Sequence, residues 1–249
     1  MELVGFSSFS HVGASAYPHL RRAAGHGNAW DPAVMTWHEI ERAQLAQALL
    51  DVTPDAPTLC EGWQARHLAA HVVLRERSPM VSAGIAVPAL SDRAEAAITR
   101  LADQAATEGA YRDLVARVAD RPARWHPASW VGESANVVEF FVHTEDVRRG
   151  AGPVPARELD AGLVEALWSH LPRAASGRLR PVPVGVVLVR DDGIRHHLRA
   201  PKADHGTVIV RGDTGELVLY LLGRGAAADV RVEGDADDVA TIEAVLPSR

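Results

Sequence analysis

Two pairs of potential metal ligands in the sequence are each four residues apart. Glu139 and His143 lie in an apolar run, and on a helix this spacing places both side chains on one face. His67 and His71 have the same spacing in another helical segment. If the two helices are neighbours, His71, Glu139 and His143 form a set of two imidazoles and one carboxylate. Such a set leaves one position of a tetrahedral zinc ion open, as catalytic zinc sites do.

The spacing alone also permits a purely structural interpretation. A Glu–His pair four residues apart stabilises a helix, and a histidine in an apolar stretch often belongs to a hydrophobic core. The HExxH zinc motif is not present, because the nearest string, residues 38–42, lacks its second histidine. In this interpretation the three side chains do not converge.

Two charged residues follow the candidate ligands by about one helical turn. Arg75 lies on the same face as His71, where it is placed to bind an anionic substrate beside the metal; a salt bridge is the alternative. Asp146 is three residues past His143 and is placed to orient its imidazole. The alternative for Asp146 is an ion pair with Arg149.

The loop before the second helix contains the single cysteine, Cys60. We find no activating base near it in the sequence, so we expect it to pack rather than to act as a nucleophile. One cysteine also excludes an internal disulfide. Trp63 is expected to anchor the loop against the helices, and His67 to lie at a polar edge rather than among the ligands.

The elements that must position these residues are mainly helical in the first part of the chain. Apolar periodicity predicts helices over about residues 36–51, 64–76 and 134–149, a helical region over 92–120 that is broken or loosened near Gly109, and a linking helix over 157–175. Thr36 and Glu39 form a capping box at the start. Four helices with irregular connections indicate an antiparallel bundle.

The pattern changes to short strands after residue 180. Strands are predicted at 182–189 and 194–199, joined by a turn at 191–193, and at 207–210 and 229–232. Helices are predicted at 215–223, with Asp213 and Glu216 as a capping pair, and at 236–245. We therefore expect a helical domain over 35–176 and a small α+β domain over 177–249. Residues 1–34 are expected to be a disordered extension, with Met35 as an alternative translation start.

Composition limits the class of protein. The chain has 249 residues, 47% of them hydrophobic and 23% charged, a net charge of −6 and a pI near 6.0. This acidic balance argues against nucleic-acid binding. No run reaches the roughly 18 to 20 apolar residues of a membrane helix, and the N-terminus does not resemble a secretory signal. We expect a cytoplasmic protein that does not bind membranes.

Two longer strings resemble a known family. PTLCEGWQARHLAAHVVLRERSP and NVVEFFVHTEDVRR together are similar to the actinobacterial metal-binding family related to mycothiol-dependent maleylpyruvate isomerase. The resemblance extends from Met35 to the C-terminus and implies a DinB-like helical bundle followed by a smaller domain. It implies metal ligands at His71, Glu139 and His143. His67 and Thr144 depart from the residues that are common in relatives, outside these three positions.

The resemblance implies a zinc-type metalloenzyme with mycothiol as cosubstrate. A thiol bound to the metal loses its proton readily and would attack a small electrophilic substrate, which gives an isomerase or an S-transferase. The alternative is a non-catalytic metal-binding protein whose C-terminal domain recognises a partner. Turnover of thiol and electrophile distinguishes the two.

Overall fold

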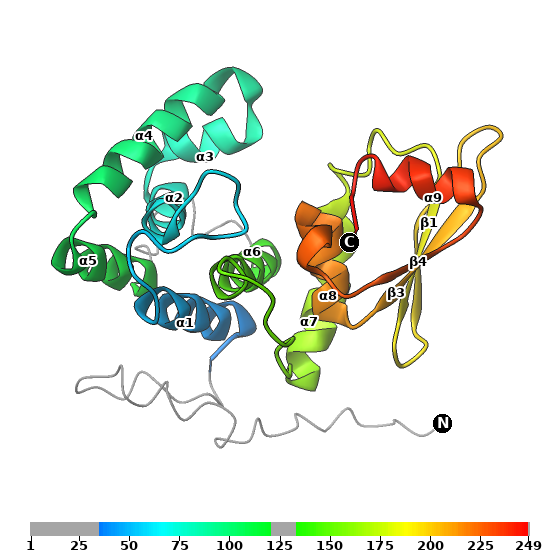
Figure 1. Ribbon diagram of the computed structural model, residues 1–249, viewed down its shortest axis with the longest axis horizontal. Coiled ribbons are helices and arrows are strands. Elements are labelled where there is room, and N and C mark those ends of the chain that lie inside the picture. The colour runs from blue at the N-terminus through cyan, green and yellow to red at the C-terminus, as the bar shows by residue number, and fades with distance from the viewer. Residues whose placement is uncertain (1–34, 121–132, 249) are drawn as a thin grey trace, which may run out of the picture.

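The computed structural model describes residues 35–120 and 133–248 (Figure 1). The extension predicted at 1–34 lies outside these residues. The described chain is mainly helical and carries one small four-stranded sheet. In Figure 1 a group of helices stands on one side, and the sheet with its own helices on the other. None of the described helices has the length and apolar character that a membrane span requires.

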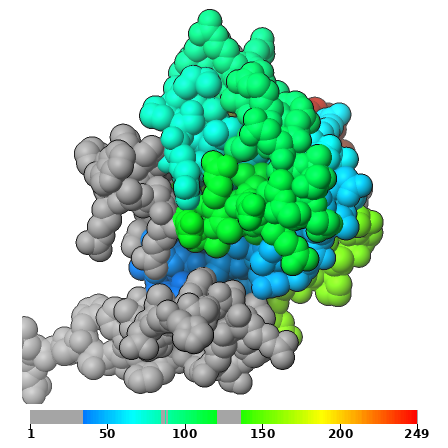
Figure 2. All heavy atoms as spheres, turned by 90° about the vertical axis from the view of Figure 1, so that its left-hand side faces the viewer, coloured from blue at the N-terminus to red at the C-terminus, as the bar shows by residue number. Residues whose placement is uncertain are grey.

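The helical group comprises six α-helices in the described chain: α1 (Trp37–Leu50), α2 (Ala65–Arg77), α3 (Pro79–Ala86), α4 (Ser91–Gln104), α5 (Glu108–Ala119) and α6 (Glu133–Arg148). Helix α1 packs against α5 and α6, whereas α2 packs against α4 and α5. The segment α3–α5 forms the outer face of this group, with α1 below it (Figure 2). The carboxylate of Glu39 accepts a hydrogen bond from the N–H of Thr36 at 3.0 Å, as the predicted capping box requires.

The third predicted helical region, residues 92–120, is broken into two helices. Helix α4 ends at Gln104, and Thr107 caps the start of α5 by accepting a hydrogen bond from the N–H of Ala110. The break therefore precedes Gly109, which lies inside α5. Helix α3 follows α2 after a single residue, Ser78, with Pro79 at its first position, where proline is tolerated.

The second part of the chain forms the sheet and its covering helices. It contains α7 (Ala161–Ala175), β1 (Gly185–Arg190), β2 (Arg195–Arg199), β3 (Thr207–Gly212), α8 (Thr214–Leu219), β4 (Arg231–Glu233) and α9 (Ala236–Glu243). The strand order is β2-β1-β3-β4, with β1 parallel to β3 and the outer pairs antiparallel. Strand β1 is buried along its whole length because it is an inner strand of the sheet.

Helix α8 was expected from a capping pair of Asp213 and Glu216, and that reason is wrong. Asp213 makes no side-chain capping bond, and Glu216 pairs instead with Arg149, the residue immediately after α6. The helix continues as the short element η4 (Tyr220–Arg224), in which Gly223 has a φ of +85°. Glycine is suited to this left-handed conformation. Leu222 and Gly223 have non-helical φ and ψ angles, so the chain changes direction immediately before Arg224.

Two hydrophobic clusters form the core, and α6 contributes to both. Phe140 packs into the cluster of α1, α2, α4 and α5, whereas Phe141 packs into the cluster of α7, α8 and the sheet. Buried ion pairs lie beside both clusters. Arg42 of α1 pairs with Glu76 of α2, and Arg149 pairs with Glu216 of α8 at 2.6 Å. Helix α6 is therefore fixed from both sides, and the division at residues 176 and 177 stays a prediction.

Candidate metal centre

Helices α2 and α6 bring His71, Glu139 and His143 together. The Nε2 atom of His71 lies 3.4 Å from Oε1 of Glu139, and Nε2 of His143 lies 3.2 Å from the same oxygen. The ligand atoms of all three side chains lie within 4.8 Å of one another. The two imidazole rings meet edge to face, with centroids 5.2 Å apart. The two nitrogens and the oxygen thus face one point, as a set of metal ligands would.

The trio is buried at its histidines and open at its carboxylate. The side chains of His71 and His143 are 10% and 9% exposed, whereas that of Glu139 is 29% exposed. The indole of Trp63 covers His71 from the loop before α2, with ring centroids 5.1 Å apart. A ligand that enters beside Glu139 would therefore reach the trio without displacing the core.

Burial and hydrogen bonds move the pKa values of the trio in different directions. Burial lowers the pKa of His71, which favours its neutral ring. Burial by itself would raise the pKa of Glu139, but hydrogen bonds with His143 and His71 hold it well below its usual value. For His143, burial lowers the pKa, and hydrogen bonds to Asp146 and Glu139 more than reverse this effect. The two carboxylates thus favour positive charge at His143.

Asp146 holds the ring of His143 from the side away from Glu139. Its Oδ2 atom accepts a hydrogen bond from Nδ1 of His143 at 2.9 Å, and its side chain is fully buried. Arg224, from η4, donates to both oxygens of Asp146, at 2.8 and 2.7 Å. Asp146 therefore pairs with Arg224 and not with Arg149, which was the alternative partner. In the neutral ring, a proton held on Nδ1 by Asp146 leaves the lone pair of Nε2 facing the trio.

Cys60 lies beside this network, which sequence reasoning missed. Its Sγ atom is 3.2 Å from Oδ2 of Asp146 and 3.5 Å from a guanidinium nitrogen of Arg224. Cys60, His143 and Asp146 also form a group with the spacing of metal ligands. The sequence offers no activating base near this thiol, whereas the fold places a carboxylate and a guanidinium beside it. No local signal could reveal it, because Asp146 and Arg224 are 86 and 164 residues away along the chain.

The two possible ligand groups share His143 but use opposite ring nitrogens. In the Cys60 group, Asp146 already binds the guanidinium of Arg224 through both oxygens, so a cation there would face a fixed positive charge. In the trio with His71, Glu139 has oxygen positions that are open to solvent. The chemistry of the donors therefore favours His71, Glu139 and His143.

The remaining candidates occupy distinct positions around the trio. Nε of Arg75 lies 3.3 Å from Oε1 of Glu139, and another of its nitrogens donates to Asn136 at 3.1 Å. Arg75 is thus at the open edge, paired as the salt-bridge alternative predicted. His67 is half-buried one turn before His71, and its Nδ1 accepts from the N–H of Gln64. It belongs to neither ligand group among the described residues.

Comparisons with known proteins find the same overall fold in one enzyme. No protein-family model and no curated protein matches the sequence. The crystal structure of the mycothiol-dependent maleylpyruvate isomerase is similar, with 19% sequence identity and a TM-score of 0.50, over 79% of this chain and 90% of that one. A histidine-to-alanine mutant of that isomerase matches over the same shares at 18% identity, with a TM-score of 0.49. The resemblance of the two sequence strings is thus accompanied by a likeness of fold.

Proposed function

We propose that this chain, which shares the fold of a mycothiol-dependent isomerase, is a metal-dependent enzyme that uses a low-molecular-weight thiol. Its substrate would be a small electrophile, and the reaction an isomerisation or an S-transfer. The helical group would correspond to a DinB-like antiparallel four-helix bundle built from α1, α2, α5 and α6. The observation that carries the proposal is the convergence of His71 and His143 on one oxygen of Glu139.

His71, Glu139 and His143 would hold one divalent metal ion, for which zinc is the best candidate. Two imidazoles and a carboxylate suit zinc, although nickel, cobalt and iron accept the same donors. When bound, such an ion lowers the pKa of a coordinated thiol and makes it a nucleophile near neutral pH. Asp146 would hold the proton of His143 on Nδ1, so that Nε2 faces the metal position.

Arg75 would bind an anionic group of the substrate at the open edge of the trio. It is 16% exposed and lies against Glu139, so its guanidinium faces the position from which a substrate would approach. With Glu139 engaged as a ligand, Arg75 would be able to pair with a carboxylate of the substrate, for which arginine has a suitable geometry. This exposure of Glu139 and Arg75 favours a reacting site over a closed structural metal site.

Metal content tests the ligand assignment. Purified wild-type protein should contain about one divalent ion per chain by elemental analysis, and His143→Ala should contain almost none. His67→Ala is the matched control, because it removes a histidine from the same helix as His71 and should leave the metal content unchanged. Equal metal content in wild type and His143→Ala would refute the assignment.

Turnover tests the thiol requirement. Maleylpyruvate, the substrate in the name of the similar enzyme, is the first probe, with and without added mycothiol. Activity should require both the thiol and the metal, and Arg75→Met should raise the KM for an anionic substrate more than it lowers kcat. Full activity without thiol would instead indicate metal-activated water and a hydrolase. No turnover of any electrophile by metal-loaded protein would favour the non-catalytic alternative.

A further inference from the structure

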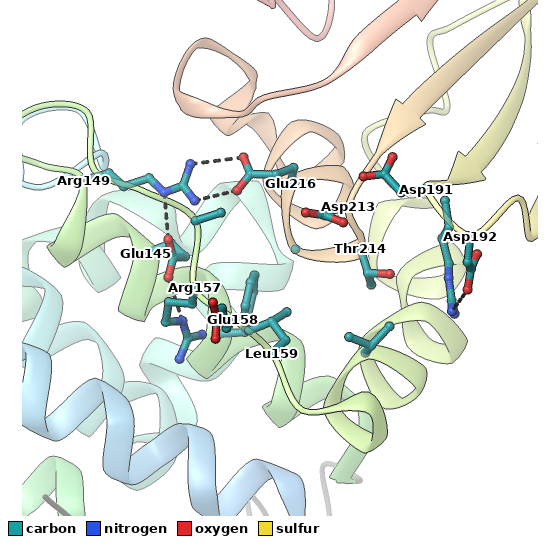
Figure 3. A pocket seen from close by; sticks show the side chains of 15 residues that line it. Glu145, Arg149, Arg157, Glu158, Leu159, Asp191, Asp192, Asp213, Thr214 and Glu216 are labelled. Atoms are coloured by element: carbon teal, nitrogen blue, oxygen red, sulfur yellow. Dashed lines mark hydrogen bonds and ion pairs between the residues drawn. The ribbon is translucent and has the colours of Figure 1, made fainter. Parts of the chain in front are cut away.

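A separate cavity lies on a different face of α6 from the metal trio. Its volume is about 470 Å³, which is within the range of roughly 300 to 1,000 Å³ that small-molecule sites occupy. It is enclosed by α6, the connection from α6 to α7, the turn between β1 and β2, and the start of α8 (Figure 3). Junctions between packed units are common places for ligand sites.

The inner wall of the cavity is apolar. Phe141 of α6, Leu159 of the connection and Val164 of α7 line it. Gly215 of α8 completes the wall, and a Cβ atom there would lie only 2.9 Å from the Phe141 ring. The close approach of α8 to α6 therefore depends on glycine. This wall suits a carbon skeleton rather than a hydrated ion.

Every arginine that lines the cavity is already neutralised by acidic partners. Each of the three guanidinium groups lies against two carboxylates, and none is left to bind an anion. The pairs are Arg149 with Glu145 and Glu216, Arg157 with Glu41 and Glu145, and Arg190 with Glu165 and Asp192. The three arginine side chains at this cavity are thus all paired with carboxylates of the protein itself.

Three further carboxylates at the rim have no positive partner among the residues that the structure describes: Glu158, Asp191 and Asp213. All three are exposed, and Asp191 and Asp213 come close together from the β1–β2 turn and the start of α8 (Figure 3). Partial desolvation at the rim and the neighbouring Asp191 raise the pKa of Asp213, as expected for two like charges that lie near each other. A cation between them would relieve this repulsion.

We propose that this cavity binds a small organic cation, such as a primary amine attached to an apolar group. The ammonium would lie between Asp191 and Asp213, and the apolar part would pack against Leu159 and Val164. The apolar wall argues against a bare metal ion, and no group with metal-ligand spacing includes these residues in the described chain. The site is independent of the thiol-dependent activity proposed above.

Calorimetric titration of the full chain with three probes of one shape tests the sign of the charge. Benzylamine carries a positive charge, benzyl alcohol is neutral and benzoate is negative. We expect saturable one-to-one binding of benzylamine, binding of benzyl alcohol weaker by about tenfold or more, and no binding of benzoate. Equal binding of benzylamine and benzoate, or binding of calcium ions without benzylamine, would overturn the proposal.

Substitutions locate the site. Asp213→Asn and Asp191→Asn should each weaken benzylamine binding by about tenfold to a hundredfold, because each removes a charged hydrogen-bond acceptor. Asp113→Asn, which makes the same change at an exposed position of α5, is the control and should have no effect. Glu139→Gln should also have no effect. If Glu139→Gln abolished binding while Asp213→Asn did not, the amine would bind at the trio and the inference would be wrong.

Discussion

Replacing Asp146 with asparagine should weaken both the fold and the proposed metal site, for separate reasons. Asp146 is fully buried and accepts hydrogen bonds from His143 and from two nitrogens of Arg224. Asparagine has nearly the same shape, so the change removes a charge without opening a cavity. It also introduces an NH₂ group, which can donate a hydrogen bond to His143.

The expected loss of stability follows from the burial of Arg224. Removing one partner of a buried ion pair costs about 3 to 5 kcal/mol, because the other charge stays desolvated. Asparagine keeps one acceptor oxygen, and the Arg224 side chain is 16% exposed. We therefore expect the lower end of that range, a free energy of unfolding reduced by about 3 kcal/mol.

The expected loss of metal affinity follows from the tautomer of His143. With a carboxylate at Nδ1, the proton stays on that nitrogen and Nε2 is free to coordinate. An asparagine NH₂ at the same place favours the opposite tautomer, with the proton on Nε2. Loss of such an outer partner typically costs about tenfold to a hundredfold in metal affinity, or about 1.4 to 2.7 kcal/mol.

The loss of stability and the loss of metal affinity are measured in separate experiments, the first on metal-free protein and the second by zinc titration. Denaturant unfolding of metal-free wild type and Asp146→Asn gives the change in stability, and competitive titration of zinc against a chelator gives the change in affinity. Asp113→Asn is the control for both. Unchanged zinc affinity in a folded Asp146→Asn variant would refute the argument that Asp146 orients a ligand. Unchanged stability would refute the cost assigned to Arg224.

The other predictions concern pH, packing and the thiol. Burial would raise the pKa of Asp146, but hydrogen bonds from Arg224 and His143 lower it below its usual value. The contribution of the Asp146 carboxylate to stability is therefore complete at neutral pH and is lost as the pH falls below about 4. In acid unfolding curves, the difference in stability between wild type and Asp146→Asn should shrink below that pH. Glu76→Gln should reduce the free energy of unfolding by about 3 kcal/mol, because Arg42 would stay buried without its charge partner; a loss below about 1 kcal/mol would contradict this. Gly150→Ala should be destabilising by about 1 to 3 kcal/mol, because its Cβ would lie 2.0 Å from the carbonyl oxygen of Pro57. Gly109→Ala should be stabilising by about 0.5 to 1 kcal/mol, because the space around this position in α5 is open. Thermal melts of the two variants and the wild type compare these effects directly. Cys60→Ser should keep its metal and most thiol-dependent activity, because a hydroxyl can still donate to Asp146, and an inactive, metal-loaded variant would identify Cys60 as the nucleophile.

The local pattern of the sequence determined most of the helices and strands. Apolar periodicity predicts α1, α2, α6 and the four strands within a few residues, because each element buries one face or is an inner strand. The Asp-Asp-Gly turn at 191–193 needs a positive φ, and Gly193 has a φ of +86°. The break predicted near Gly109 lies a few residues earlier, between α4 and α5, because the cap at Thr107 decides its position and Gly109 fits inside a helix.

The candidate ligands also follow from the sequence, but their convergence does not. Spacing places Glu139 and His143 on one face of α6, but His71 is 68 positions before Glu139 and the sequence carries no signal of their distance in space. That distance depends on how α2 and α6 pack within the helical group, which only the tertiary structure decides.

The surroundings of the trio and the second cavity were beyond sequence reasoning altogether. Arg224 reaches Asp146 from a turn at the end of α8, 78 residues further along the chain, and the cavity has walls from α6, α7, α8 and the β1–β2 turn. Periodicity reports which face of an element is buried, and it contains nothing about which distant element covers that face. The sequence alone thus determined the chemistry available on each helix, whereas tertiary packing selected Arg224 as the partner of Asp146 and brought Asp191 near Asp213 with no arginine partner among the described residues.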